Sequence, residues 1–229
     1  MHILANATQY SIGFRAIKLL VWSIIIVLPI LIWLENSAVL HDLRYGAAFS
    51  QLLYALSKLT ALYAIIALWL QLVITLNKTT SLKSFLPVRL YQSHRVLGWL
   101  AFGLTSLHIT LFVTAVSIRK QTLTINLLGL DFSDYYHTGI SIGAIAFWSM
   151  LIGVASIAAS YYWLKSRVRN LVLLHRLVIL AVILAFVHSY MIGTETRQGF
   201  YLYYYHFLFA TISLSLVLRF KSSVLRFKE

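Results

Sequence analysis

Four histidines stand inside long apolar segments of this chain, and their spacing is nearly the same in each segment. His94 and His108 are 14 residues apart in one segment, and His175 and His188 are 13 residues apart in another. At about 1.5 Å of rise per residue, the two histidines of a segment would lie roughly 20 Å apart along a helix. A histidine loses its hydration in hydrocarbon, so intramembrane histidines are usually retained for function.

Two parallel helices with histidines at matching depths could bind iron porphyrin. The porphyrin supplies four nitrogens, and each helix would supply one neutral imidazole as an axial ligand. Two such levels predict two stacked b-type haems, with the four histidines as iron ligands. The chain contains no cysteine, which excludes thiolate ligands, iron–sulfur clusters and covalent haem attachment. No catalytic side chain is expected, because two axial imidazoles leave no open position on the iron.

Helical phase supports this arrangement better on the first segment than on the second. At about 100° per residue, 14 residues fall roughly 40° short of four turns, so the first two histidines share a helix face. Gly98, Ala101 and Thr105 lie on that face and would leave room for a macrocycle. On the second segment the two histidines are about 140° apart, so a tilt, a bend or different imidazole rotamers are required. Ala181 and Ala185 would leave room there.

The composition indicates a multi-pass membrane protein. Of the 229 residues 60% are hydrophobic and 11% are charged, and the mean hydropathy is +0.83, which is far from the balance of a soluble domain. A window of about 20 apolar residues predicts six membrane-spanning helices. They cover approximately 17–34, 51–76, 94–117, 139–163, 171–191 and 200–218. The predicted fold is a single all-α transmembrane bundle over residues 1–229, which encloses both haems.

Lysines and arginines set the expected orientation of the bundle. Most of the 19 lie in the N-terminus, the second and fourth connections, and the C-terminal tail. Because such residues are retained on the cytoplasmic side, both termini should be cytoplasmic. The net charge of +13 then reflects topology and contact with anionic lipids of the bilayer rather than nucleic-acid binding. We expect a protein of the bacterial inner (plasma) membrane.

In this orientation both histidine segments run outward from the cytoplasm. His94 and His175 form an inner pair near the cytoplasmic side. His108 and His188 form an outer pair near the opposite side. These two names are kept below.

Basic residues near each pair could contact haem propionates. Lys58 lies about two turns inside the outer end of the second span, where its ammonium would either snorkel outward or pair with an anion in the bundle. We favour pairing, with a propionate of the outer haem as the anion. Arg89, Arg95 and Arg176 crowd the cytoplasmic ends of spans three and five, where inner-haem propionates would emerge. The positive-inside rule alone also accounts for each of these arginines.

Two other classes of protein were weighed. A transporter or channel usually places acids within its spans. Here all six acids lie in loops, at helix ends or in the tail: Glu35, Asp42, Asp131, Asp134, Glu195 and Glu229. This distribution weakens the transporter interpretation. An accessory haem subunit with no terminal reaction of its own remains open. The remaining histidines are expected to bond locally: His2, His41, His137 and His206.

Three sequence stretches together resemble the ferric reductase-like transmembrane domain. They are HRVLGWLAFGLTSLHI, LLHRLVILAVILAFVH and SKLTALYAIIALWLQL. That family includes ferric reductases, the membrane half of NADPH oxidases, and the haem subunit of periplasmic methionine sulfoxide reductases. The resemblance implies that the inner pair ligates a cytoplasmic-side haem, that the outer pair ligates an outer haem, and that position 58 is basic. It also implies electron transfer across the membrane to an extracytoplasmic acceptor.

The departures from the family pattern refine this expectation. No glycine-rich dinucleotide fingerprint is present, so electrons should come from a separate reductase, with its own flavin, or from a quinol. Phe112 stands where NADPH oxidases tend to carry a further histidine, so superoxide production is not favoured. The methionine sulfoxide reductase subunit typically lacks the histidine found here as His94. We therefore predict an oxidoreductase, or an oxidoreductase subunit, that passes electrons to an extracytoplasmic acceptor. The alternative is delivery to a partner reductase such as methionine sulfoxide reductase.

Overall fold

The part of the chain that the structure describes is mainly helical. The computed structural model describes residues 2–37, 41, 44–76, 94–163, 169–197 and 199–226, and no strand occurs among them. The helices are α1 (His2–Asn36), α3 (Phe49–Leu76), α5 (His94–Lys120), α6 (Tyr135–Ala158), α7 (Arg169–Leu174), α8 (Leu177–Ile192) and α9 (Gly199–Arg226). Shorter helical turns cover Ile125–Leu128, Ala159–Trp163 and Glu195–Arg197. Arg89 lies outside the described residues.

The six predicted membrane-spanning helices are confirmed. Helices long and apolar enough to cross a bilayer cover Leu19–Asn36, Phe49–Leu76, His94–Lys120, Tyr135–Tyr162, Asn170–Ile192 and Gly199–Arg219. The largest difference is the earlier start of α6. Asp134 caps that helix, because its carboxylate accepts the backbone N–H of His137. This bond, with a second from the His137 ring, lowers the pKa of the Asp134 carboxyl.

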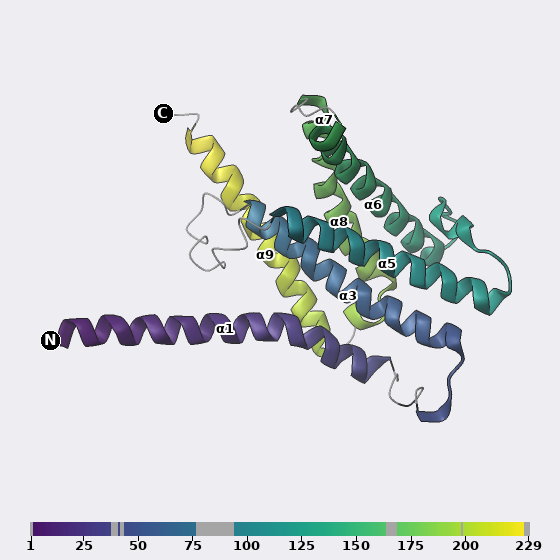
Figure 1. The fold of residues 1–229 in the computed structure, drawn as a ribbon, viewed down its shortest axis with the longest axis horizontal. Coiled ribbons are helices and arrows are strands. Elements are labelled where there is room, and N and C mark those ends of the chain that lie inside the picture. Colours follow the sequence, from purple (N-terminus) through teal and green to yellow (C-terminus); the bar gives the residue numbers. More distant parts are fainter. Residues whose placement is uncertain are drawn as a thin grey trace.

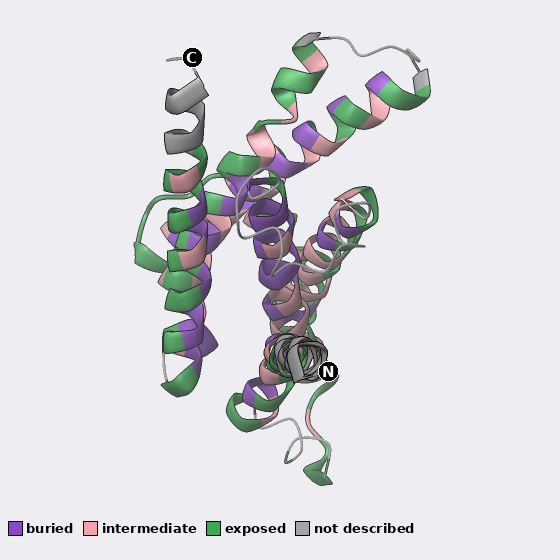
Figure 2. Ribbon diagram, turned by 90° about the vertical axis from the view of Figure 1, so that its left-hand side faces the viewer, coloured by how far each residue is buried: buried purple, intermediate pink, exposed green. Residues whose placement is uncertain are grey.

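The bundle contains two antiparallel helix pairs, α3 with α5 and α6 with α8 (Figure 1). α9 packs on α3, and α1 reaches α3 only through its C-terminal half, while its N-terminal half projects from the bundle (Figure 1). In α3, 61% of the spanning segment is buried, against 11% in α5. α3 is therefore the central helix, and buried residues gather where helices face one another (Figure 2).

The fifth predicted span is divided into two helices. α7 ends at Leu174 and α8 begins at Leu177, so His175 and Arg176 lie in the break. Around it, backbone N–H groups bond to carbonyls three residues back, as Val178 does to His175 at 3.1 Å. Such a segment turns about 120° per residue instead of about 100°, which rotates His175 toward the side of His188. The break thus reduces the angular offset between His175 and His188 that the 13-residue spacing predicts for an ideal helix.

Candidate functional site

The inner pair meets where one helix begins and another breaks. His94 is the first residue of α5, and His175 lies between α7 and α8. Their ring centroids are 6.3 Å apart and their planes are nearly perpendicular, at 83°. An imidazole nitrogen binds a metal at about 2 Å, so two axial imidazoles on one metal have centroids roughly 6 Å apart. The separation of the inner pair suits ligation of one metal ion by both rings.

The outer pair lines a cavity between the two helix pairs. His108, from α5, and His188, from α8, both border this cavity. The cavity volume is about 180 Å³. One water molecule needs roughly 10–15 Å³. Its apolar wall includes several small residues: Ala61, Ala64, Gly143, Ala144, Ala181 and Ala185. A cavity of this lining could accept a large apolar group.

The residues predicted to leave room for a macrocycle divide into two sets. Thr105, Ala181 and Ala185 line the cavity, as expected. Gly98 instead faces α3, because a Cβ there would lie 3.1 Å from a side-chain nitrogen of that helix. Ala101 is 2% exposed and belongs to the packed core. Helical phase therefore predicted the helix face on which these small residues lie. It did not predict which neighbouring helix each of them contacts.

Three of the four histidines direct Nδ1 at a backbone carbonyl oxygen of a neighbouring helix. The pairs are His108 with Ser57 (2.8 Å), His188 with Gly139 (2.8 Å) and His175 with Gly153 (3.1 Å). A carbonyl oxygen only accepts, so in each neutral ring the hydrogen is on Nδ1. The Nε2 lone pair is then available to a metal, and the Nδ1 bond fixes the ring orientation, as is common among metal-binding histidines.

His94 is held by side chains instead. Its Nδ1 lies 3.4 Å from Thr75 Oγ1, and that hydroxyl donates to the Gln71 carbonyl at 2.7 Å, so Oγ1 accepts from the ring. The Gln71 amide Nε2 donates to the His94 carbonyl at 2.8 Å and lies 3.3 Å from His94 Nε2. The amide Oε1 of Gln71 is buried with no hydrogen-bond partner among the described residues. His94 thus has the same tautomer as the other three, with an amide donor near its Nε2.

Glycines of α6 position the histidines contributed by the fifth span. Gly139 and Gly153, which bond to His188 and His175, are 14 residues apart, and they match the 13-residue spacing of those histidines on an antiparallel helix. Gly143 makes room for the His188 ring, because a Cβ there would lie 2.5 Å from its Nδ1. These glycines were missed by sequence reasoning. Their signal is the small-residue spacing in GISIGAIAFWSMLIG, which is typical of close helix packing in membranes.

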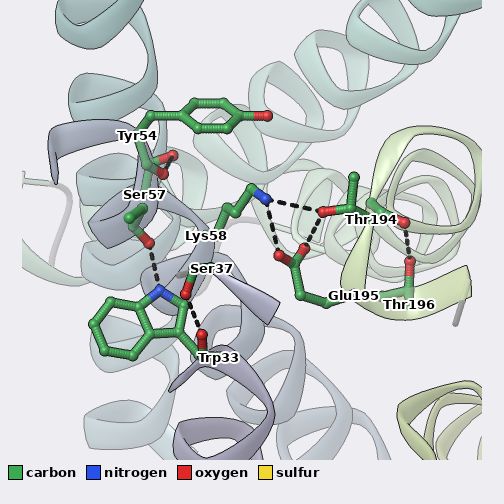
Figure 3. A network of polar contacts seen from close by, with 10 residues as sticks. Trp33, Ser37, Tyr54, Ser57, Lys58, Thr194, Glu195 and Thr196 are labelled. Carbon is green, nitrogen blue, oxygen red and sulfur yellow. Dashed lines mark hydrogen bonds and ion pairs between the residues drawn. The ribbon is translucent and has the colours of Figure 1, made fainter. Parts of the chain in front are cut away.

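Lys58 has a protein carboxylate as its partner. Its Nζ donates to Glu195 Oε1 at 2.9 Å and to Thr194 Oγ1 at 2.9 Å, and the Thr194 hydroxyl donates to Glu195 Oε2 at 2.7 Å (Figure 3). Glu195 is only 4% exposed. Lys58 therefore pairs with an anion inside the bundle instead of snorkelling outward. That anion, Glu195, is one of the acids that the sequence analysis assigned to loops, helix ends or the tail. All three residues line the cavity of the outer pair, so a contact between Lys58 and a propionate stays a prediction.

Two of the predicted inner-level arginines, Arg95 and Arg176, are exposed. The Arg95 guanidinium lies 4.7 Å from the ring centroid of Tyr161 and hydrogen-bonds to the Tyr162 hydroxyl. Arg176 lies in the break beside His175 and is the N-cap residue of α8. Contacts of either arginine with propionates stay predictions.

Three of the four histidines outside the two pairs have local partners, as expected, and the His2 side chain lies outside the described ones. His137 Nδ1 bonds to the Asp134 carboxylate at 2.7 Å, and His206 Nδ1 donates to the Leu202 carbonyl at 2.6 Å. His41 packs against the ring of Tyr45 with centroids 4.5 Å apart.

Comparison with known proteins adds no assignment. No protein-family profile, no curated protein and no solved structure matches the chain. In the part of the chain that the structure describes, no group of three or more histidine, cysteine or acidic side chains gathers to hold a metal ion. Haem needs only two protein ligands per iron, since the porphyrin supplies the others.

Proposed function

We propose that this protein is a transmembrane electron conduit that holds two b-type haems, one at the inner pair and one at the outer pair. Bound haem would supply one-electron chemistry at its iron. The observation that carries the proposal is the arrangement of four histidines at two levels, in which every Nδ1 has an acceptor. That pattern leaves the Nε2 atoms of His108, His175 and His188 available as ligands, and His94 Nε2 would become available on displacement of the Gln71 amide.

The surrounding residues would keep each site rigid and dry. Backbone carbonyls of α3 and α6 fix three rings, and the outer cavity is lined mainly by apolar side chains. Between the two levels, the rings of Phe102 on α5 and Phe147 on α6 stack with centroids 6.5 Å apart and planes within 10°. They would fill the space between the two haems and exclude water from it.

The direction of transfer follows from the expected orientation. A separate reductase or a quinol would donate electrons, and an acceptor on the extracytoplasmic side would receive them. Because two imidazoles complete the iron coordination, the acceptor would be reduced at the edge of the outer site or through a partner protein. A partner of the methionine sulfoxide reductase type is one such acceptor.

Haem content tests the proposal directly. Protein purified from cells supplied with haem should release about two protohaems per chain and show a low-spin spectrum, because each iron has two imidazole ligands. His137→Ala and His206→Ala are matched controls, since both histidines bond locally. These variants should keep both haems. A colourless wild-type protein would reject the proposal.

A further inference from the structure

We propose that the Lys58–Glu195 ion pair is a positioning device that sets the separation of the outer pair. The inference rests on the proposed function, because it assigns the pair to the outer haem ligands. It makes Glu195 a positioning residue, although this acid lies seven residues beyond His188 and in a connection.

On the α3 side, neighbouring residues serve both partners. The Ser57 carbonyl accepts His108 Nδ1 at 2.8 Å, and the next residue, Lys58, reaches across to Glu195. Ser57 is 1% exposed, and its hydroxyl donates to the Tyr54 carbonyl at 2.8 Å. The anchor of His108 and the cationic end of the ion pair therefore share one turn of α3.

On the α8 side, the carboxylate is tied to the end of the histidine helix. The Thr196 hydroxyl bonds to the Ser189 carbonyl at 2.5 Å and to the Gly193 carbonyl at 3.0 Å. Ser189 directly follows His188. A Cβ at Gly193 would collide with the Ser189 carbonyl oxygen and the Thr196 hydroxyl, so this turn packs closely against the end of α8. The position of Glu195 is thus coupled to the position of His188.

The ion pair connects two parts of the bundle that border the same cavity at this level. The cavity separates α3 and α5 from α6 and α8 beside the outer pair. Across it, the Lys58 ammonium bonds to both Thr194 and Glu195, and these two residues bond to each other (Figure 3). Loss of the Lys58 charge would leave the buried Glu195 carboxylate uncompensated, and loss of the Glu195 charge would leave the half-buried Lys58 ammonium without its counter-charge. Either loss should drive a local rearrangement. The two helices that carry the outer pair would then move apart.

The positioning role and a propionate contact predict different results when Glu195 is removed. If Lys58 served a propionate, removal of Glu195 would free its ammonium and leave the outer haem in place. If the ion pair sets the separation, Glu195→Gln and Lys58→Met should have the same effect. Each should lower haem content from about two to about one per chain, with the outer haem lost and the inner haem kept as an internal reference. Asp131→Asn removes an exposed acid outside the spans and should change nothing.

A charge exchange and a distance measurement complete the experiment. Lys58→Glu combined with Glu195→Lys should recover most of the outer haem. The chain has no cysteine, so nitroxide labels would react only at introduced cysteines. Labels at Ile118→Cys on α5 and Tyr190→Cys on α8, both exposed positions, report the separation of these two helices. Glu195→Gln should lengthen or broaden that distance in haem-free protein. This readout does not need haem, so it tests the ion pair even where the proposed function fails.

Two results would overturn the inference. One is an unchanged label distance in both Glu195→Gln and Lys58→Met. The other is loss of the outer haem in Lys58→Met with full retention in Glu195→Gln, which would assign Lys58 to a propionate. A colourless wild type with a lengthened distance in the variants would keep the positioning role of the ion pair and reject only the haem.

Discussion

The inner and outer levels hold their histidines by different means. At the outer level both rings bond to backbone carbonyls, those of Ser57 and Gly139. At the inner level His175 bonds to a backbone carbonyl, but His94 depends on the side chains of Gln71 and Thr75. A substitution cannot remove a backbone carbonyl, whereas it can remove an amide or a hydroxyl. The outer level should therefore be sensitive to helix spacing, and the inner level to the chemistry of α3.

Both levels nonetheless follow one register. On α3, Ser57 and Gln71 are 14 residues apart, as are His108 and His94 on the antiparallel α5. Two antiparallel helices with equal rise keep such contacts aligned along their length. On α6, Gly139 and Gly153 are also 14 residues apart, whereas their partners His188, on α8, and His175, in the break before α8, are 13 residues apart. Each pair of neighbouring segments thus presents one histidine at each level.

Replacement of the ligands should have the largest effect. His94→Ala and His175→Ala should each lose the inner haem and keep most of the outer haem. His108→Ala and His188→Ala should do the reverse, because each haem needs both imidazoles of its level. Haem extraction and low-temperature spectra of the four variants check this. Matching spectra from His94→Ala and His188→Ala would contradict the assignment of the pairs by depth.

Crowding at Gly143 should affect the outer level alone. A Cβ there would lie 2.5 Å from His188 Nδ1, so Gly143→Ala should displace the ring from the Gly139 carbonyl. Overpacking of this kind typically costs about 1–3 kcal/mol. We expect a lower thermal stability and a reduced outer-haem content.

Gly103→Ala is the matched control for this prediction. Gly103 lies in α5 between the two histidine levels, and a Cβ there meets nothing within 4 Å. This variant should keep both haems. Equal haem loss in Gly103→Ala and Gly143→Ala would show that helix propensity, not the space beside His188, decides the outcome.

The sequence was sufficient to predict features that depend on one helix at a time. Apolar length predicted the six spans, and the spacing of His94 and His108 predicted two depths. Contacts between residues of different helices could not be predicted in this way. The bond of Lys58 to Glu195 joins residues 137 apart, and burial of that acid depends on how the α8–α9 connection folds back. Likewise, the role of Gly143 depends on the α6–α8 register, which no periodicity within α6 reveals.

The smallest expected effect concerns Gln71, and it would sharpen the contrast between the levels. Its amide donates to the His94 carbonyl and approaches the ligating Nε2, so a metal at that nitrogen must displace the amide. Gln71→Leu removes this competitor together with a buried oxygen that lacks a partner among the described residues. A neutral hydrogen bond contributes about 0.5–1.5 kcal/mol, so inner-haem affinity should rise by roughly 2- to 10-fold. Haem titration of stripped protein measures this, with outer-haem affinity as the internal control. A lower inner-haem affinity in Gln71→Leu would mean instead that the amide chiefly orients His94. Gln71 on α3 would then position the inner pair rather than compete with the metal.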